Sequence, residues 1–114
     1  PDTPATQDII NPDTLALMRP GSVIINPGRG TLIDDAALIT ALDTGHISHA
    51  TLDVFRIEPL PKDHPYWASP KVTVTPHIAS ETRESTAAEV IAENLRRAEA
   101  NEPLRFLVDR QAAY

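Results

Sequence analysis

Hydrophobic and polar positions divide this chain into short segments that prolines separate. Three runs are rich in apolar and β-branched residues, as is typical of strands: SVIIN (22–26), HATLDVF (49–55) and KVTVT (71–75). Pro70 and Pro76 bound the third run. We therefore expect three strands, and the first, with its consecutive aliphatic residues, is expected to be buried.

Two helices are predicted around the first of these strands. Asn11 as an N-cap and Pro12 at the first helical position start a short helix that ends at the next Pro-Gly pair. The second helix covers about 35–44, where apolar residues recur with the helical period. Asp34 is its expected N-cap, and Gly45 is expected in the left-handed turn that ends it.

A longer helix is predicted from about Glu81 to Ala100, and Asn101 and Pro103 close it. One stripe of this helix consists of apolar and small residues that are expected to face inward: Ala87, Val90, Ile91, Asn94, Leu95 and Ala98. The charged residues are expected to face water: Glu84, Glu89, Glu93, Arg96 and Arg97.

The alternation of helices and strands with short links predicts the α/β class, with parallel strands joined by crossover connections. Three parallel strands are fewer than such sheets usually contain, so at least one edge is expected to be bare unless another segment or subunit pairs with it. The segment RIEPLPKDHPYWAS (56–69) is too long for a simple turn and is a candidate for function.

Charge and composition exclude several kinds of function. The 114 residues include 10 basic and 16 acidic side chains, a formal net charge of −6, which disfavours binding to nucleic acid. The chain has no cysteine, which excludes disulfides and fits a reducing compartment, so a cytoplasmic location is expected. Its longest aliphatic run, Val23-Ile24-Ile25, is far shorter than a membrane span of about 20 residues, so no membrane association is expected. The opening PDTPATQ is turn-like and begins with proline, so we expect the chain to be part of a longer polypeptide.

Four side chains with useful chemistry follow the predicted strands. Arg29 comes after the first strand, Asp53 and Glu58 come at and beyond the end of the second, and His77 comes after the third. In open parallel sheets, ligands bind beyond the carboxyl ends of the strands. We therefore expect these four side chains to meet at one edge of the sheet.

A cation, a carboxylate and an imidazole suit the reduction of a 2-oxo acid. The Arg29 guanidinium can bind a substrate carboxylate through two parallel N–H···O bonds. His77 can protonate the carbonyl oxygen, and Glu58 can orient the ring and favour its charged form. Asp53 can accept a hydrogen bond from a nicotinamide carboxamide, while the cofactor carries out the hydride chemistry.

Each of these residues also has a structural interpretation. Arg29, between two glycines, is equally compatible with a solvated turn, and Glu58 with an ordinary loop charge. His77 can serve as a structural hydrogen-bond partner near a helix start. Asp53 can accept backbone N–H bonds at the strand end, which is the commoner role for such a residue. Only their convergence at one edge favours the catalytic interpretation.

Other constellations have less support. His46, His49, His64 and His77 lack the paired spacing and companion ligands of a zinc site, so no metal is predicted. Ser80 has no second histidine nearby in the sequence, which leaves little support for a hydrolase.

Three stretches occur in the order NPGRGTLID (26–34), LDVFRIEPLP (52–61) and VTVTPHIAS (72–80). Together they resemble the C-terminal signatures of the D-isomer-specific 2-hydroxyacid dehydrogenases. Glu58 follows Arg29 by 29 residues, and His77 follows Glu58 by 19 residues, which is similar to the spacing in that family. The resemblance extends over essentially the whole chain.

The resemblance implies that Arg29, Glu58 and His77 are catalytic, with His77 as the acid/base and Glu58 as its partner. It implies NAD or NADP as cofactor, with these contact residues: Thr6, Pro27, Gly28, Arg29, Asp53, His77, Ile78, Ala79 and Ser80. The family often has Ala or Ser in place of Gly28 and Gly in place of Ala79, and neither difference is expected to prevent binding.

Two further features are similar to the branch of the family that reduces glyoxylate and hydroxypyruvate. They are Trp67 in the segment DHPYW and the ending VDRQAAY (108–114). Trp67 is equally compatible with packing of the long loop. The implied reaction is the reduction of a small 2-oxo acid to a D-2-hydroxy acid.

The glycine-rich loop that opens the family's dinucleotide-binding domain is absent, because the glycines do not form a GxGxxG pattern: Gly21, Gly28, Gly30 and Gly45. The resemblance therefore implies an incomplete domain, the C-terminal part of a Rossmann-type doubly wound parallel sheet. Residues 1–103 would form the C-terminal half of the dinucleotide-binding domain. Residues 104–114 would form a tail that returns to an absent substrate domain.

Two hypotheses for function follow. In the first, the chain is a fragment of an NAD(P)-dependent oxidoreductase whose other partners are the missing N-terminal part of the same protein and a second copy in a homodimer. The isolated chain is then expected to be inactive and to self-associate. In the second, the chain is a non-enzymatic, dehydrogenase-like interaction or dimerisation module that pairs through its bare sheet edge.

Overall fold

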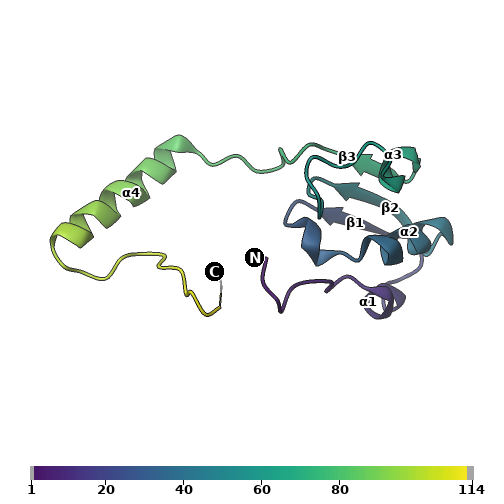
Figure 1. Ribbon diagram of the computed structural model, residues 1–114, viewed down its shortest axis with the longest axis horizontal. Helices are drawn as coiled ribbons and strands as arrows, with labels where there is room; N and C mark the ends of the chain where they lie inside the picture. Colours follow the sequence, from purple (N-terminus) through teal and green to yellow (C-terminus); the bar gives the residue numbers. More distant parts are fainter. Residues whose placement is uncertain (1, 113–114) are drawn as a thin grey trace. The chain divides into compact units, whose positions relative to one another are not determined.

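Three parallel strands form the centre of the part of the chain that ends at Ala79, and a second unit begins at Ser80 (Figure 1). The computed structural model describes residues 2–112. Pro1 lies outside the described residues, and so do residues 113–114, which belong to the predicted tail 104–114. The α/β class predicted from the alternation of elements is confirmed.

The strands are β1 (Ser22–Asn26), β2 (Ile47–Leu52) and β3 (Val72–Val74), in the spatial order β1-β2-β3. Both pairings are parallel, and Asn26 lies opposite Leu52, which in turn lies opposite Val74. The carboxyl ends of all three strands therefore meet at one edge of the sheet. The residues that follow them emerge side by side, as expected from the sequence.

The predicted bounds of the second strand, 49–55, are wrong at both ends. β2 begins two residues earlier, at Ile47, and ends at Leu52. The Asp53 N–H still donates to the Asn26 carbonyl oxygen at 3.0 Å, and beyond this bond the Asp53 side chain bonds to the turn that follows β3. The sequence remains apolar at Val54 and Phe55, but the strand pairing does not extend to these residues.

Helix α1 (Pro12–Ala16) begins as the sequence predicts, because the Asn11 side chain accepts hydrogen bonds from the N–H groups of Asp13 and Thr14. It is only five residues long and ends before the predicted Pro-Gly stop. Helix α2 (Asp35–Asp43) is capped by Asp34, whose side chain accepts from the Ala37 N–H. Gly45 follows α2 with φ of +78°, the left-handed conformation expected of it.

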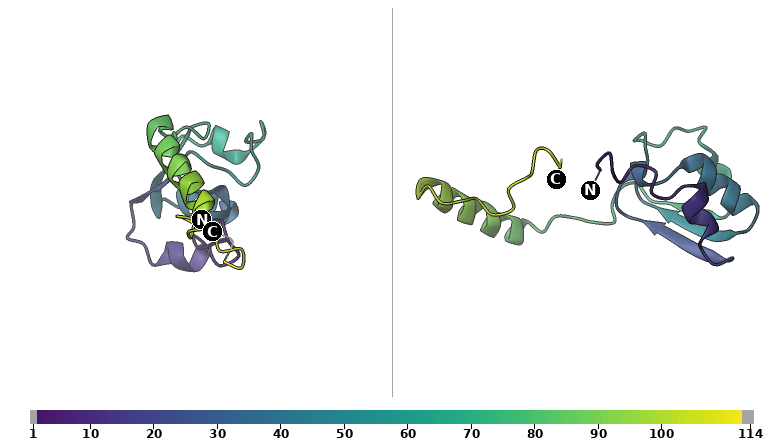
Figure 2. Two further views of the ribbon diagram at one scale, coloured as in Figure 1. Left: turned by 90° about the vertical axis from the view of Figure 1, so that its left-hand side faces the viewer. Right: turned by 90° about the horizontal axis from the view of Figure 1, so that it is seen from below.

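The core lies on one side of the sheet. Helix α2 packs against β2, and α1 packs against α2 (Figure 1 and Figure 2). The largest fully buried side chains are Tyr66, Leu38, Leu42, Ile47 and Leu52. On the other side of β1, Val23 and Ile25 are 53% and 70% exposed. The first strand is therefore buried on one face only, whereas its aliphatic run predicts burial of the whole strand.

Two short helical turns occur where only loops are expected. One is the 3₁₀ turn η1 (Gly30–Leu32), and the other is α3 (Pro65–Ala68), inside the long segment 56–69. Helix α3 places Tyr66 in the core, where its hydroxyl donates to the Asp35 carboxylate at 2.8 Å. Elements this short carry too few periodic positions to be recognised from sequence.

The second unit contains helix α4 (Glu84–Glu99) followed by an irregular segment. The predicted inward stripe of this helix is not buried: Ile91 and Leu95 are 60% and 62% exposed. Asn94, predicted for the same stripe, exchanges hydrogen bonds of 3.1 and 2.8 Å with the backbone of Arg105. The irregular segment after α4 also leaves Phe106 and Leu107 exposed, so within residues 80–112 the apolar side chains of the two segments do not bury one another.

Gly30 is the point of closest approach between the loop after β1 and the loop after β2. A Cβ atom at this position would lie 1.9 Å from the Phe55 carbonyl carbon and 2.4 Å from the Arg56 nitrogen. Both neighbours are backbone atoms, so no rotamer change can make room for a side chain. The absence of a side chain at Gly30 therefore allows the two loops to pack directly.

We predict that Gly30→Ala lowers the free energy of unfolding by about 3 kcal/mol or more, because the two backbones must move apart. Gly21→Ala is the matched control: it has φ of +83° with no atom within 4 Å of its Cβ, so only the backbone conformation is strained, at about 1–2 kcal/mol. Urea unfolding of both variants measures the difference. Equal losses of stability would contradict the tight contact at Gly30.

Candidate active site

His77 and Glu58 form a hydrogen-bonded pair at the carboxyl edge of the sheet. The His77 Nδ1 lies 2.8 Å from Glu58 Oε2, and the other carboxylate oxygen accepts from the Phe55 N–H at 2.9 Å. Because a carboxylate only accepts, Nδ1 carries the proton in this contact. The bond from His77, followed by the bond from Phe55, lowers the pKa of the Glu58 carboxyl. The ring is thereby oriented with Nε2 directed away from Glu58.

Asp53 holds the turn that carries His77. Its buried carboxylate accepts hydrogen bonds from the Thr75 hydroxyl and from the N–H groups of Ile78 and Ala79, both at 2.9 Å. Burial by itself disfavours the charged form, but these three bonds, helped by His77, outweigh it and lower the pKa of Asp53. His77 sits in this turn with φ of +55°, a conformation that non-glycine residues adopt only when their surroundings require it.

The structural interpretation of Asp53, that it accepts backbone N–H bonds, is thus confirmed. It does not replace the cofactor role that the resemblance implies. Oδ1 accepts two of the three bonds and Oδ2 accepts one, so Oδ2 retains capacity for a further donor.

Asn26 holds the turn that carries Arg29. Its buried side-chain amide accepts from the Gly28 N–H at 3.1 Å and donates to the Arg29 carbonyl oxygen at 2.9 Å. The Arg29 side chain is exposed, and its Nη1 donates to the Gly28 carbonyl oxygen at 2.7 Å. Sequence reasoning assigned Asn26 only to the strand end. The available signal was a polar residue that closes an otherwise apolar strand.

The three side chains predicted to be catalytic line one hollow of about 230 Å³. It is bounded by Arg29, Glu58 and His77 together with Asp2, Gly30, Thr31, Phe55 and Arg56. Residues that are far apart in the sequence are therefore brought together as the predicted edge requires. The hollow combines a guanidinium with a hydrogen-bonded imidazole, which suits an anionic ligand that also accepts a proton.

Arg56 is a structural contributor that sequence reasoning missed. Its Nε donates to the Ile33 carbonyl oxygen at 3.1 Å, and its Nη2 pairs with Asp8. It also donates toward the Thr31 carbonyl oxygen at 3.4 Å. Arg56 thereby ties the loop after β2 to the loop after β1 and to the N-terminal segment, and no local sequence signal indicates these partners.

A second, more apolar hollow of about 510 Å³ adjoins His77 and Glu58. Its other lining residues are Phe55, Pro59, Leu60, Trp67, Val74 and Pro76. Trp67 is 54% exposed, and its indole N–H donates to the Pro61 carbonyl oxygen at 2.9 Å. The bond to Pro61 supports a packing role for Trp67 within the long loop.

The remaining predicted cofactor contacts occupy four places. Pro27 and Gly28 lie in the Asn26 turn, and Ile78 and Ala79 lie in the Asp53 turn. Thr6 lies in a turn of the N-terminal segment, where its hydroxyl donates to the Thr3 carbonyl oxygen at 3.1 Å. Ser80 begins the second unit.

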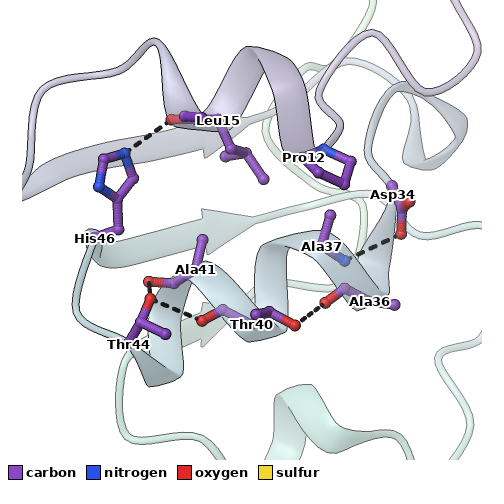
Figure 3. Close-up of a pocket in the computed structure, with 10 residues that line it drawn as sticks. Pro12, Leu15, Asp34, Ala36, Ala37, Thr40, Ala41, Thr44 and His46 are labelled. Carbon is purple, nitrogen blue, oxygen red and sulfur yellow. Dashed lines mark hydrogen bonds between the residues drawn. The ribbon is translucent and has the colours of Figure 1, made fainter.

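A further hollow of about 500 Å³ lies between α1 and α2, away from these residues (Figure 3). Small and apolar side chains such as Ala37 and Ala41 line most of it. His46 lies at its rim, and its Nε2 is 2.9 Å from the Leu15 carbonyl oxygen, so this histidine serves the packing of α1.

Within residues 2–112, no group of three or more potential metal ligands converges. Over the same residues, no helix is long and apolar enough to cross a membrane.

Comparisons with known proteins find similarity to one family over most of the chain. The model of the family "D-isomer specific 2-hydroxyacid dehydrogenase, NAD binding domain" matches residues 1–79. Glyoxylate/hydroxypyruvate reductase A from Photorhabdus laumondii is 43% identical over 114 residues, which are all of this chain and 36% of that relative. The enzyme of the same name from Klebsiella pneumoniae is also 43% identical over 114 residues. The chain therefore spans about a third of the length of these curated relatives.

Solved structures with high similarity cover the whole chain. A D-isomer specific 2-hydroxyacid dehydrogenase from Xanthobacter autotrophicus Py2, in complex with NADPH and MES, matches with a TM-score of 0.94 and 50% identity, over 47% of its own chain. The NADPH-dependent glyoxylate/hydroxypyruvate reductase of Sinorhizobium meliloti, in complex with NADP and sulfate, matches with a TM-score of 0.91 and 35% identity, over 38% of its chain.

The lowered pKa values of Asp53 and Glu58 predict acid sensitivity. In the folded state both carboxyls bind protons less readily than in the unfolded state, so their contribution to stability is complete above their ordinary pKa values of 3.8 and 4.5. That contribution is lost as the pH falls below these values and through the folded-state pKa values.

We expect Asp53→Asn to be less stable than wild type near neutral pH, because one N–H of the turn loses its acceptor, and to lose less further stability below about pH 4. Urea unfolding at a series of pH values measures both effects. Asp63→Asn, at an exposed position of the long loop, is the matched control and is expected to follow wild type. An unchanged acid dependence in Asp53→Asn would contradict the role of the carboxylate.

Proposed function

The chain belongs to the D-isomer-specific 2-hydroxyacid dehydrogenase family, and from this membership we propose that it carries the catalytic edge of an oxidoreductase. The proposed reaction is the reduction of small 2-oxo acids, glyoxylate and hydroxypyruvate, to D-2-hydroxy acids with NADH or NADPH. The observation that supports it best is the His77–Glu58 hydrogen bond of 2.8 Å beside Arg29 in one hollow. The names of the relatives support the substrate class.

His77 is the proposed acid/base. Its Nδ1–H is held by Glu58, so the proton that reaches a substrate carbonyl oxygen is carried on Nε2 of the imidazolium. The lowered pKa of Glu58 keeps this carboxylate charged near neutral pH, where it stabilises the positive ring. After proton transfer the ring is neutral and still bonded to Glu58, ready for the reverse reaction.

Arg29 is the proposed binder of the substrate carboxylate. One of its N–H groups donates to the Gly28 carbonyl oxygen, which leaves other donors of the guanidinium available for a bidentate pair. A 2-oxo acid carries its carboxylate next to the carbonyl, so Arg29 and His77 would act on adjacent groups of one small molecule.

The residues of this edge fit the nicotinamide end of a dinucleotide. Asp53 Oδ2 accepts one bond and retains acceptor capacity for a carboxamide N–H, and Pro27, Gly28, Ile78 and Ala79 lie in the turns that Asn26 and Asp53 hold. Thr6 and Ser80 are the further proposed contacts. A bound nicotinamide cofactor supplies the hydride in this chemistry.

We propose further that the chain works as part of a longer polypeptide, in the cytoplasm and as a homodimer. The pyrophosphate-binding glycine loop is not in this sequence, and the relatives are about three times as long. Residues 1–103 would then complete a dinucleotide-binding domain, residues 104–114 would return to the substrate domain, and the 114-residue chain alone would be inactive.

We predict that His77→Ala in the complete polypeptide lowers kcat for glyoxylate or hydroxypyruvate reduction by about 10²–10⁴, because the proton donor is lost. Steady-state assays that follow NAD(P)H oxidation measure it. His49→Ala, a histidine within β2 that bonds to Thr73, is the matched control and is expected to keep kcat close to wild type. Wild-type turnover in His77→Ala would refute the acid/base role, whereas a wild-type polypeptide without turnover would favour the non-enzymatic module.

We predict that Arg29→Lys raises KM for the 2-oxo acid by about 10-fold or more, since lysine cannot form the planar bidentate pair. The affinity for NAD(P)H is expected to change little, because the substitution keeps the backbone of the turn. Arg19→Lys, at an exposed position before β1, controls for the loss of a guanidinium elsewhere. An unchanged KM would show that the substrate carboxylate binds another group.

A further inference from the structure

We propose that Asn26 is a positioning residue whose side-chain amide sets the direction in which Arg29 presents its guanidinium. This inference rests on the proposed function of Arg29. It concerns a residue that makes no contact with the hollow itself, since Asn26 is not among the residues that line it.

The orientation of the Asn26 amide is determined by its two partners. The Gly28 N–H can only donate, so it selects the amide oxygen, at 3.1 Å. The Arg29 carbonyl can only accept, so it selects the amide nitrogen, at 2.9 Å. One planar group thus bridges the Pro27–Gly28 peptide, which carries the Gly28 N–H, and the Arg29–Gly30 peptide, which carries the Arg29 carbonyl, and it limits how the segment between them can turn.

The burial of Asn26 makes both bonds necessary. The residue is only 7% exposed, so water cannot readily replace either partner. The main-chain oxygen of Asn26 also accepts from the Asp53 N–H at 3.0 Å. The main chain of Asn26 is therefore fixed by the sheet, and its side chain fixes the turn. Asn26 thus gives Arg29 a rigid support.

Its influence is expected to be specific to Arg29. His77 is held by the turn that Asp53 organises, and Glu58 is held by His77 and the Phe55 N–H. None of these contacts involves the Asn26 side chain. A change in that side chain should therefore disturb the binding of the substrate carboxylate and leave the proton donor in place.

The sharpest test is Asn26→Asp, which keeps the shape and the acceptor for Gly28 but replaces the donor to the Arg29 carbonyl with an oxygen. In the complete polypeptide we expect KM for glyoxylate to rise by about 10-fold to 10²-fold, with KM for NAD(P)H close to wild type. A merely structural role would reduce the active fraction, which lowers kcat and leaves KM unchanged. Asn101→Asp, at the exposed residue after α4, is the matched control for an added charge.

Hydrogen exchange measured by mass spectrometry provides the second readout. Asn26→Asp is expected to accelerate exchange in peptides that cover residues 27–33 and to leave peptides that cover 77–79 unchanged. Faster exchange together with the raised KM supports the proposal, and either change without the other overturns it. If the wild-type protein does not reduce 2-oxo acids, the proposed function fails, and exchange alone decides whether Asn26 holds the Arg29 turn.

Discussion

The buried carboxylate of Asp53 is the interaction on which the site depends. An ionised carboxylate out of contact with water is costly unless hydrogen bonds compensate it. Here the compensation comes from the Thr75 hydroxyl and from two consecutive N–H groups after His77. Those groups converge on one carboxylate only if the chain bends sharply at His77, which is why this residue accepts a left-handed backbone. The hydrogen bonds that keep the Asp53 carboxylate ionised are therefore the same bonds that fix the position of His77.

The ends of β1 and β2 solve the same problem with different chemistry. Each strand end carries a buried polar side chain that organises a turn with a candidate catalytic residue: Asn26 holds the turn after β1, which carries Arg29, and Asp53, just after β2, holds the turn after β3, which carries His77. A neutral amide can both accept and donate, so Asn26 suits a turn that presents one N–H and one carbonyl. A carboxylate only accepts, so Asp53 suits a turn that presents N–H groups. The parallel register, with Asn26 opposite Leu52, sets the two supports side by side.

Apolar surface remains exposed in both units. Val23 and Ile25 are exposed on one face of the sheet in the first unit, and Ile91 and Leu95 are exposed on α4 in the second. Parallel sheets and amphipathic helices ordinarily bury such faces. The proposal that the chain works within a longer polypeptide accounts for both observations, because the relatives that share its signatures are about three times as long.

The sequence by itself determined the features that depend on neighbouring residues. The helix starts at Asn11 and Asp34, the left-handed Gly45, the three strand centres and the α/β class all follow from local patterns, and the edge with Arg29, Glu58 and His77 follows from the parallel order of the strands. Only the tertiary structure decided where β2 ends, which face of β1 is buried, and what Asn26, Asp53 and Arg56 bond to. Their partners, apart from those of Asn26 in its own turn, lie more than 20 residues away in the chain. No pattern of adjacent side chains encodes such contacts, since they form only when packing and register bring distant segments together.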